Sequence, residues 1–151
     1  GGKVASAWAY PFMVSIRWYP NHHFCGGTIV NKLWILTSAH CVAEETTATV
    51  FAVVGTNTLS FGGRTVTFRE IIVHPSFNDT GYLSNDIAMI QLSSALRYLP
   101  TIAPVVLDRA GSQSVINVTL IGWGETRNNG SASDFLRDLS TQTITPAACS
   151  I

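Results

Sequence analysis

Two neighbouring stretches decide the fold of this chain: Phe24-Cys25-Gly26-Gly27-Thr28-Ile29-Val30 and Trp34-Ile35-Leu36-Thr37-Ser38-Ala39-His40-Cys41. Both are short runs rich in apolar, aromatic and β-branched residues, a composition typical of strands. The second run ends at a histidine beside a cysteine. A third stretch, Asn85-Asp86-Ile87-Ala88-Met89-Ile90, places an acid in front of another apolar run, 46 residues after His40. We therefore expect strands whose ends carry a histidine and an acid.

The rest of the chain also has the periodicity of strands. Runs rich in Val, Ile, Thr and aromatic residues predict strands over residues 12–18, 24–30, 33–36, 50–54, 65–73, 87–92, 115–121 and 135–143. Gly62-Gly63 and Asn128-Asn129-Gly130 predict hairpin turns. Thr145-Pro146 predicts a helix start, with Thr as the N-cap and Pro at the first helical position. Many short strands at this spacing predict an antiparallel barrel or sandwich.

Composition narrows the classes of partner. The chain has 151 residues, of which 46% are hydrophobic, enough for a sizeable core. Charged residues make up 12%, about half the average of about 25% for soluble domains. Nine basic residues balance nine acidic ones without a basic run, so nothing favours nucleic acid or an anionic membrane as a partner. No window of about 18 uncharged apolar residues occurs, so we expect no membrane span.

A change in character near residues 98–111 suggests how the chain is organised. Pro100 and Pro104 interrupt the strand pattern there. We expect a complete first unit over residues 1–97, a linker over 98–111 and an incomplete second unit over 112–151. A barrel cut after about three strands would leave sheet edges open. The chain starts Gly1-Gly2-Lys3 without a methionine, so we also expect a processed or incomplete N-terminus.

The three cysteines form an odd set. Cys25 and Cys41 would close a loop of the size for which a disulfide stabilises by about 3 kcal/mol. Cys149 then lacks a partner, which indicates an intermolecular bond, a reactive thiol or a partner outside this sequence, and the last reading is favoured. Sequons at Asn78, Asn117 and Asn129 are compatible with secretion, although such triplets also occur by chance.

His40 and Asp86 each have a plain structural reading and a chemical one. His40 could be a core histidine that hydrogen-bonds a backbone carbonyl, and Asp86 could be a turn residue. The chemical reading makes His40 a general base whose ring is held in one tautomer and shielded from bulk water. Asp86, partly buried, would accept a hydrogen bond from that ring and stabilise the imidazolium. The occurrence of both motifs in one chain favours the chemical reading.

Other candidate ligands receive plain readings. His22 and His23 are expected in a solvated hairpin loop, and without Asp or Cys partners at ligand spacing they make no zinc site. We expect no metal and no cofactor.

Together these motifs resemble those of the trypsin/chymotrypsin-type serine endopeptidases. The resemblance rests on Cys25-Gly26-Gly27, Thr37-Ser38-Ala39-His40-Cys41, Asn85-Asp86-Ile87-Ala88 and Gly122-Trp123-Gly124, which occur in the family's order. It covers essentially the whole chain. It implies an all-β fold of two antiparallel β-barrels of the trypsin-like type, the second incomplete in this chain, with an active site in the cleft between them.

The resemblance also assigns roles. His40 would be the general base, Asp86 its orienting acid, and Cys25 and Cys41 a disulfide; the partner of Cys149 would lie further downstream. Gly1-Gly2 match the end of the Ile-Val-Gly-Gly terminus that zymogen cleavage creates in the family. The nucleophile is missing, because neither Gly-Asp-Ser-Gly-Gly nor any Gly-x-Ser-x-Gly occurs. The oxyanion donors beside that serine and the primary specificity pocket are missing too, so this polypeptide alone is expected to be inactive.

The expected function is that of a secreted, extracellular serine endopeptidase in the full-length protein. Its partners would be protein or peptide substrates and proteinaceous protease inhibitors. One alternative is a non-catalytic homologue that acts as a binding or regulatory module after losing the nucleophile. Another is an independent interaction domain, against which the open second barrel and Cys149 count. The sequence leaves the cleavage specificity open.

Overall fold

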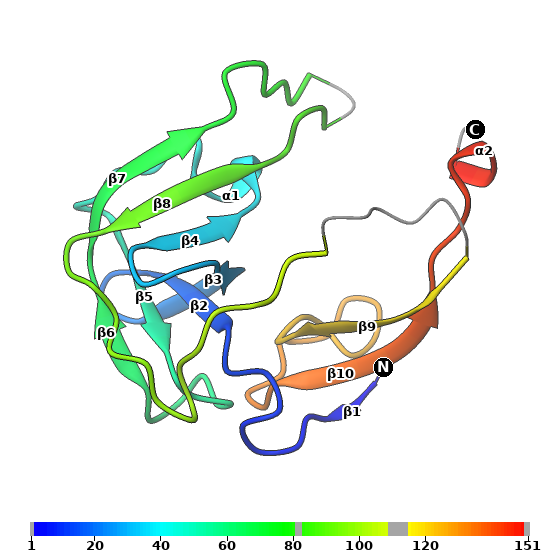
Figure 1. Cartoon of the computed structure of the whole chain (residues 1–151), viewed down its shortest axis with the longest axis horizontal. Coiled ribbons are helices and arrows are strands. Elements are labelled where there is room, and N and C mark those ends of the chain that lie inside the picture. Colours follow the sequence, from blue (N-terminus) through cyan, green and yellow to red (C-terminus); the bar gives the residue numbers. More distant parts are fainter. Residues whose placement is uncertain (1, 81–82, 109–114, 150–151) are drawn as a thin grey trace.

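The computed structural model describes residues 2–80, 83–108 and 115–149, which form two antiparallel sheets and two short helices (Figure 1). The larger sheet has seven strands: β2 (Met13–Trp18), β3 (His22–Ile29), β4 (Trp34–Thr37), β5 (Val50–Val54), β6 (Arg64–Val66), β7 (Phe68–Val73) and β8 (Ala88–Leu92). The smaller sheet has three: β1 (Lys3–Val4), β9 (Asn117–Gly122) and β10 (Arg137–Gln142). The helices are α1 (Ala39–Val42) and α2 (Pro146–Cys149).

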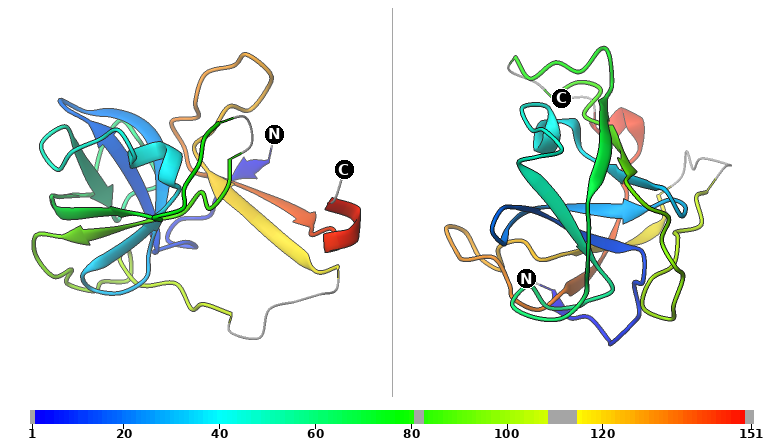
Figure 2. Two further views of the ribbon diagram at one scale, coloured as in Figure 1. Left: turned by 90° about the horizontal axis from the view of Figure 1, so that it is seen from above. Right: turned by 90° about the vertical axis from the view of Figure 1, so that its left-hand side faces the viewer.

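The topology of the larger sheet makes it curl. Its strands lie in the order β6-β5-β2-β3-β4-β8-β7, and every neighbouring pair is antiparallel. The two outermost strands, β6 and β7, are separated in the sequence by Thr67 alone. A single residue cannot span a flat sheet of this width, so the sheet curls into a half-barrel, as Figure 2 shows. The expectation of an all-β fold is confirmed.

The core fills the inside of this half-barrel. Its fully buried side chains come from neighbouring strands: Val14, Ile16, Ile29, Ile35, Val50, Val54 and Ile90. Strand β8 alternates between buried and half-buried residues, as a strand with one face on a core must. Gly27 lies where β3 crosses this core, and a Cβ there would sit 2.9 Å from Cγ2 of Ile35. The second glycine of the Cys25-Gly26-Gly27 motif is thus required by close packing.

The smaller sheet is built on the pairing of β9 with β10. Their register runs from Asn117 opposite Gln142 to Gly122 opposite Arg137, and β1 adds to the other edge of β10 with Lys3 opposite Asp138. Large apolar side chains on this sheet are exposed: Val4, Leu120 and Leu139. In the part of the chain described, nothing covers this apolar surface.

A second, smaller core joins the two sheets. Ala5, Met13, Trp123 and Leu136 are buried together there. The carbonyl of Asn57, on the loop after β5, accepts hydrogen bonds from Trp123 Nε1 (3.2 Å) and from the Leu136 amide (2.7 Å). The half-barrel and the smaller sheet therefore pack against each other through this cluster. The unit boundaries expected at residues 97 and 112 stay predictions, and part of the expected linker, residues 109–111, lies outside the described residues.

Most predicted elements appear close to their expected ends. Residues 65–73, predicted as one strand, form two strands, because the chain bends at Thr67 between the partners β5 and β8. The turn at Gly62-Gly63 is confirmed with φ of 80° and 78°, and Asn129 takes φ 55° in the other predicted turn. Pro146 opens α2 as expected. Within the described residues, no helix has the length and apolarity needed to cross a membrane.

Candidate active site

His40 lies on α1, a helix of four residues directly after β4. The Cys25–Cys41 disulfide ties this helix to β3, with the two Cα atoms 6.2 Å apart. The predicted disulfide is thus confirmed. A helix this short is not stable by itself, so the cross-link and the preceding strand fix the backbone of His40.

Asp86 reaches the same point from the strand on the other side of β4. Asp86 lies two residues before β8 begins at Ala88, and Ala88 pairs with Thr37 of β4. The residue before it, Asn85, has φ 54°, and its side-chain amide donates to the Ser76 carbonyl at 2.9 Å. This left-handed turn directs the Asp86 carboxylate towards α1.

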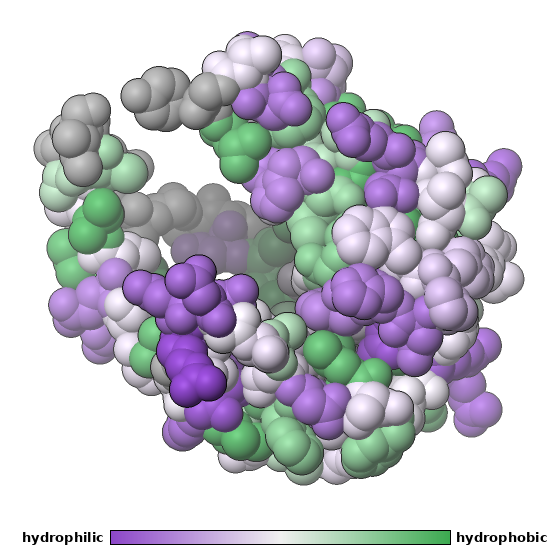
Figure 3. All heavy atoms as spheres, turned by 180° about the vertical axis from the view of Figure 1, so that it is seen from behind, coloured by the Kyte–Doolittle hydropathy of each residue, from purple (hydrophilic) through white to green (hydrophobic). Residues whose placement is uncertain are grey.

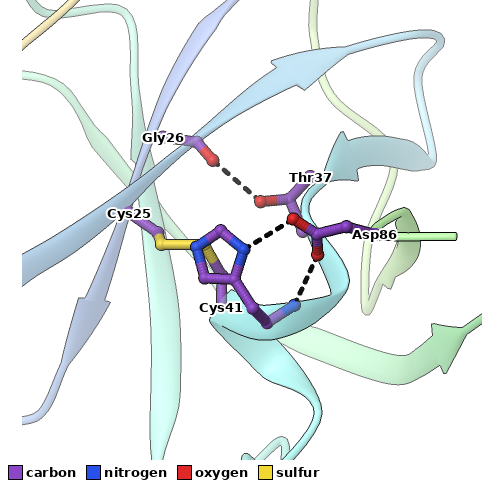
Figure 4. Close-up of polar contacts among 6 residues, drawn as sticks. Cys25, Gly26, Thr37, Cys41 and Asp86 are labelled. Carbon is purple, nitrogen blue, oxygen red and sulfur yellow. Dashed lines mark hydrogen bonds and ion pairs between the residues drawn. A yellow bond between two sulfur atoms is a disulfide. The ribbon is translucent and has the colours of Figure 1, made fainter. Parts of the chain in front are cut away.

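The carboxylate of Asp86 makes two hydrogen bonds with His40 (Figure 4). Oδ2 lies 2.7 Å from the ring nitrogen Nδ1, and Oδ1 accepts the backbone N–H of His40 at 2.8 Å. The two contacts fix the ring and the backbone of one residue together. The structure therefore brings together two residues that lie 46 positions apart in the sequence.

These hydrogen bonds hold the pKa of Asp86 below its usual value, first through the backbone N–H of His40 and then through its side chain. An ionised carboxylate only accepts hydrogen bonds, so Nδ1 of His40 donates to Asp86, and the lone pair of the neutral ring is on Nε2. Sγ of Cys41 lies 3.5 Å from Nε2, but a disulfide sulfur has no hydrogen to donate. The site can therefore accept a proton at Nε2.

Exposure of the site differs in part from the expectation. The side chain of Asp86 is 21% exposed, so it is partly buried as predicted. The side chain of His40 is 48% exposed, and the expected shielding from bulk water is wrong for the described part of the chain. Asp86 contacts the ring at Nδ1 and the disulfide sulfur of Cys41 lies near Nε2.

Two cavities flank the His40–Asp86 pair. One, of about 370 Å³, is lined by Phe24, His40, Glu44, Phe77, Asp79 and the disulfide. The other, of about 400 Å³, lies behind Asp86 and reaches from Gly27 and Thr37 to Ile121 on the smaller sheet. Figure 3 shows the molecular surface hollowed between the larger half-barrel and the smaller sheet. Asp86 therefore borders a cavity that reaches the smaller sheet, whereas the cavity beside His40 is lined by the half-barrel and its loops.

His23 corrects one sequence interpretation. It was expected in a solvated loop, but β3 begins at His22, and His23 packs edge-on against Trp123 with ring centroids 5.6 Å apart. Its Nδ1 shares a hydrogen bond of 2.8 Å with Ser15 Oγ. Burial, then Arg17 and His22, lower the pKa of His23 to about 4. Trp123, which packs on His23, is distant in the sequence, so no local pattern could predict this contact.

A buried polar network surrounds His23. Ser15, fully buried, accepts from Nε of Arg17 at 2.8 Å. Nη1 of Arg17 donates to Asn21 Oδ1 at 2.7 Å and to the Leu59 carbonyl at 2.9 Å. Burial lowers the pKa of this guanidinium, but an arginine stays charged at every relevant pH. No local pattern in the sequence indicates this network, because Arg17 bonds the Leu59 carbonyl, 42 positions away.

Metal ligation is not available at His40. Across the described ranges, the residues with ligand atoms grouped closely enough are Cys25, His40 and Cys41, within 4.8 Å of one another. Both sulfur atoms are consumed in the disulfide and cannot act as thiolates. His22 and His23 belong to no such group of described residues.

Comparison with known proteins agrees with this architecture. The family described as Trypsin matches residues 1–151. The chain belongs to the trypsin family. It is 32% identical over 151 residues to Granzyme M of Homo sapiens, covering 99% of this chain and 58% of that protein. It is 30% identical over 154 residues to Trypsin of Xenopus laevis, covering 99% of this chain and 60% of that relative.

A third relative gives the same picture. Chymotrypsin-like elastase family member 1 of Rattus norvegicus is 31% identical over 159 residues, with 99% of this chain and 59% of the relative covered. The trypsin-family chain thus spans about three fifths of the length of these three curated relatives. The resemblance inferred from the motifs is confirmed, and so is the trypsin-like all-β fold.

Proposed function

We propose that the full-length protein is a secreted serine endopeptidase in which His40 is the general base and Asp86 orients it. The observation that supports this most is the double hydrogen bond from His40 to Asp86, in which Nδ1 donates and the lone pair of the neutral ring is left on Nε2. This trypsin-family chain supplies two of the three groups of a Ser-His-Asp triad. The third, a serine, would lie outside residues 1–151.

The reaction follows from the protonation state of His40. Nε2 takes the proton of the serine hydroxyl while its oxygen attacks the peptide carbonyl carbon. His40 then gives that proton to the amine nitrogen as the C–N bond breaks, which leaves an acyl-enzyme. Water then attacks the acyl carbonyl carbon as His40 takes one of its protons, and His40 returns a proton to the serine oxygen as the ester C–O bond breaks. Asp86 stays ionised throughout and stabilises the imidazolium, while its bond to Nδ1 holds the ring in one orientation.

The same proposal accounts for the rest of the chain. Residues 1–97 would form the first barrel, 98–111 the linker and 112–151 the start of a second barrel whose remaining strands would cover the apolar side chains of the small sheet. Cys149, exposed and unpaired among the described residues, would bond to a cysteine outside this sequence. The Cys25–Cys41 disulfide is typical of secreted proteins. Partners would be protein or peptide substrates and protein inhibitors, and the chain alone would be inactive.

Substitution of Asp86 in the full-length protein tests the proposal. Asp86→Asn keeps the shape of the side chain but favours the wrong tautomer of His40, so kcat on a peptide amide should fall by about 10⁴-fold. Glu70→Gln, an exposed acid on β7, is the matched control and should leave kcat unchanged.

A loss below about tenfold in the Asp86→Asn variant would refute the assigned role. No turnover in the unaltered protein on any peptide would favour the non-catalytic alternative, a binding or regulatory module.

A further inference from the structure

We propose that Asn78 carries an N-linked glycan and that this glycan stands beside the cavity next to His40, where it hinders folded protein partners more than short peptides. The attachment rests on the proposed secretion, and the effect on partners rests on the proposed function. Three sequons occur in the chain, and the structure distinguishes them.

The backbone of Asn78 is held at the base of a surface loop between β7 and β8. Its amide donates to the Ser84 carbonyl at 3.1 Å, and its carbonyl accepts from the Ser84 amide at 3.0 Å. The residue itself is exposed. A sugar attached there would leave the loop base intact.

The side chains of the sequon are already paired. Oδ1 of Asn78 accepts from the Thr80 amide at 2.9 Å and from Thr80 Oγ1 at 2.6 Å. The hydroxyl that the sequon requires therefore lies against the amide that would be modified. Among the described residues, no hydrogen bond engages Nδ2 of Asn78, so the attachment displaces no described contact.

The covalent step needs a lipid-linked oligosaccharide pyrophosphate as the donor. Nδ2 of Asn78 attacks C1 of the first sugar, and an N–C bond forms as the C1–O bond to the pyrophosphate breaks. The lipid pyrophosphate leaves with the bonding electron pair, and the amide nitrogen loses one proton. No oxidant or reductant takes part.

The other two sequons have different settings. Asn117 begins β9, and its Oδ1 accepts from Nε2 of Gln142 on the paired strand at 3.0 Å, so its side chain is held across the ladder. Asn129 is exposed in a turn with φ 55°, and no described hydrogen bond joins it to Ser131. Of the three sequons, only that of Asn78 lies in an exposed loop and has its hydroxyl group hydrogen-bonded to the asparagine side chain.

The position of Asn78 gives the glycan a functional consequence. Its two sequence neighbours, Phe77 and Asp79, both line the cavity of about 370 Å³ that also contains His40. Asn78 itself does not line the cavity, so a glycan on it extends from the outer side of the wall that Phe77 and Asp79 form. A folded partner that covers this cavity must displace or avoid a bulky sugar, whereas an extended short peptide need not.

The attachment is tested on the full-length protein secreted from eukaryotic cells, by peptide mapping before and after enzymatic removal of N-glycans. We expect a glycan on Asn78 in the unaltered protein and in Thr80→Ser, which keeps the sequon. Asn78→Gln and Thr80→Ala should both lose it, while Asn129→Gln should keep it. An unmodified Asn78 in secreted, folded protein would overturn the proposal, whether or not the protein is an active enzyme.

The effect on partners is measured by comparing Asn78→Gln with the unaltered protein. Association with a folded Kunitz-type inhibitor should be faster by about threefold or more without the glycan, through the on-rate. The kcat/KM for a short peptide amide should stay the same. Equal association rates, or an equal gain for the peptide, would overturn the role at the cavity; a protein without turnover would instead count against the proposed function.

Discussion

Two histidines of this chain show how the surroundings of one residue decide what an imidazole can do. His40 is half-exposed and held by an ionised carboxylate, so its far nitrogen can take up a proton from a substrate. His23 is packed against Trp123 and bonded through Nδ1 to a buried serine, so its ring is kept neutral. The first arrangement is suited to chemistry and the second to packing between the sheets.

The buried His23 should make stability depend on pH. Its pKa is about 4 in the folded chain against an ordinary value of 6.5, so between these values the unfolded chain binds a proton that the folded chain does not. The stability that wild type gains over His23→Gln should therefore be largest above pH 6.5 and shrink as the pH falls towards about 4. Urea unfolding across this range measures it, with His74→Gln as the control, because His74 is not among the groups that lower the pKa of His23. A constant difference from neutral pH to about 4 would contradict the buried, neutral state.

Gly26 and Gly27 offer a matched pair of substitutions. A Cβ on Gly27 would meet Ile35 at 2.9 Å and the Leu36 carbonyl at 3.2 Å, whereas a Cβ on Gly26 would meet nothing within 4 Å. Gly27→Ala should therefore lower the free energy of unfolding by about 1–3 kcal/mol through overpacking. Gly26→Ala should change it by no more than about 0.5 kcal/mol. Equal losses in the two variants, measured by denaturant unfolding, would show that close packing against Ile35 is not the reason for a glycine at position 27.

At the scale of elements, α1 depends on its neighbours. It has four residues, its N-cap Ser38 makes no side-chain capping hydrogen bond, and its position comes from β4 and the Cys25–Cys41 disulfide. This explains why the sequence predicted β4 but not α1: so short a helix has too few residues to show a helical pattern. His40 was placed correctly only through the family motif.

Removal of the disulfide tests this dependence. The double variant Cys25→Ala, Cys41→Ala should lose about 3 kcal/mol of unfolding free energy, measured by urea titration. In the unaltered protein, neither of these cysteines should react with an alkylating reagent under denaturing, non-reducing conditions. Two alkylated thiols at these positions would show that the bond is absent.

The strands were more predictable than the contacts between them. Val50–Val54 was predicted with both ends correct, because five consecutive apolar residues between polar ones are a local signal. Strand β1 was missed, because two residues gain strand geometry only by pairing with β10 more than 130 positions later. The contact of His23 with Trp123 was missed for the same reason.

At the scale of the whole molecule, the cavity between Asp86 and Ile121 exists only because the two sheets are packed together. Leu136, fully buried between them, contacts a cluster that draws on both the N-terminal segment and the loop after β9. Leu136→Ala should lower the free energy of unfolding by about 2–5 kcal/mol. Leu33→Ala, partly exposed before β4, should cost less than about 1 kcal/mol. Similar losses in the two variants, compared by thermal or urea unfolding, would mean that this core does not join the sheets.

We propose that His40 and Asp86 activate a serine that lies outside residues 1–151. Reaction of the full-length protein with a fluorophosphonate probe, followed by peptide mapping, tests it most directly. We expect a single modified serine outside residues 1–151, and no modification in His40→Ala folded to the same circular dichroism spectrum. Modification of a serine within residues 1–151, or undiminished labelling of His40→Ala, would contradict the account.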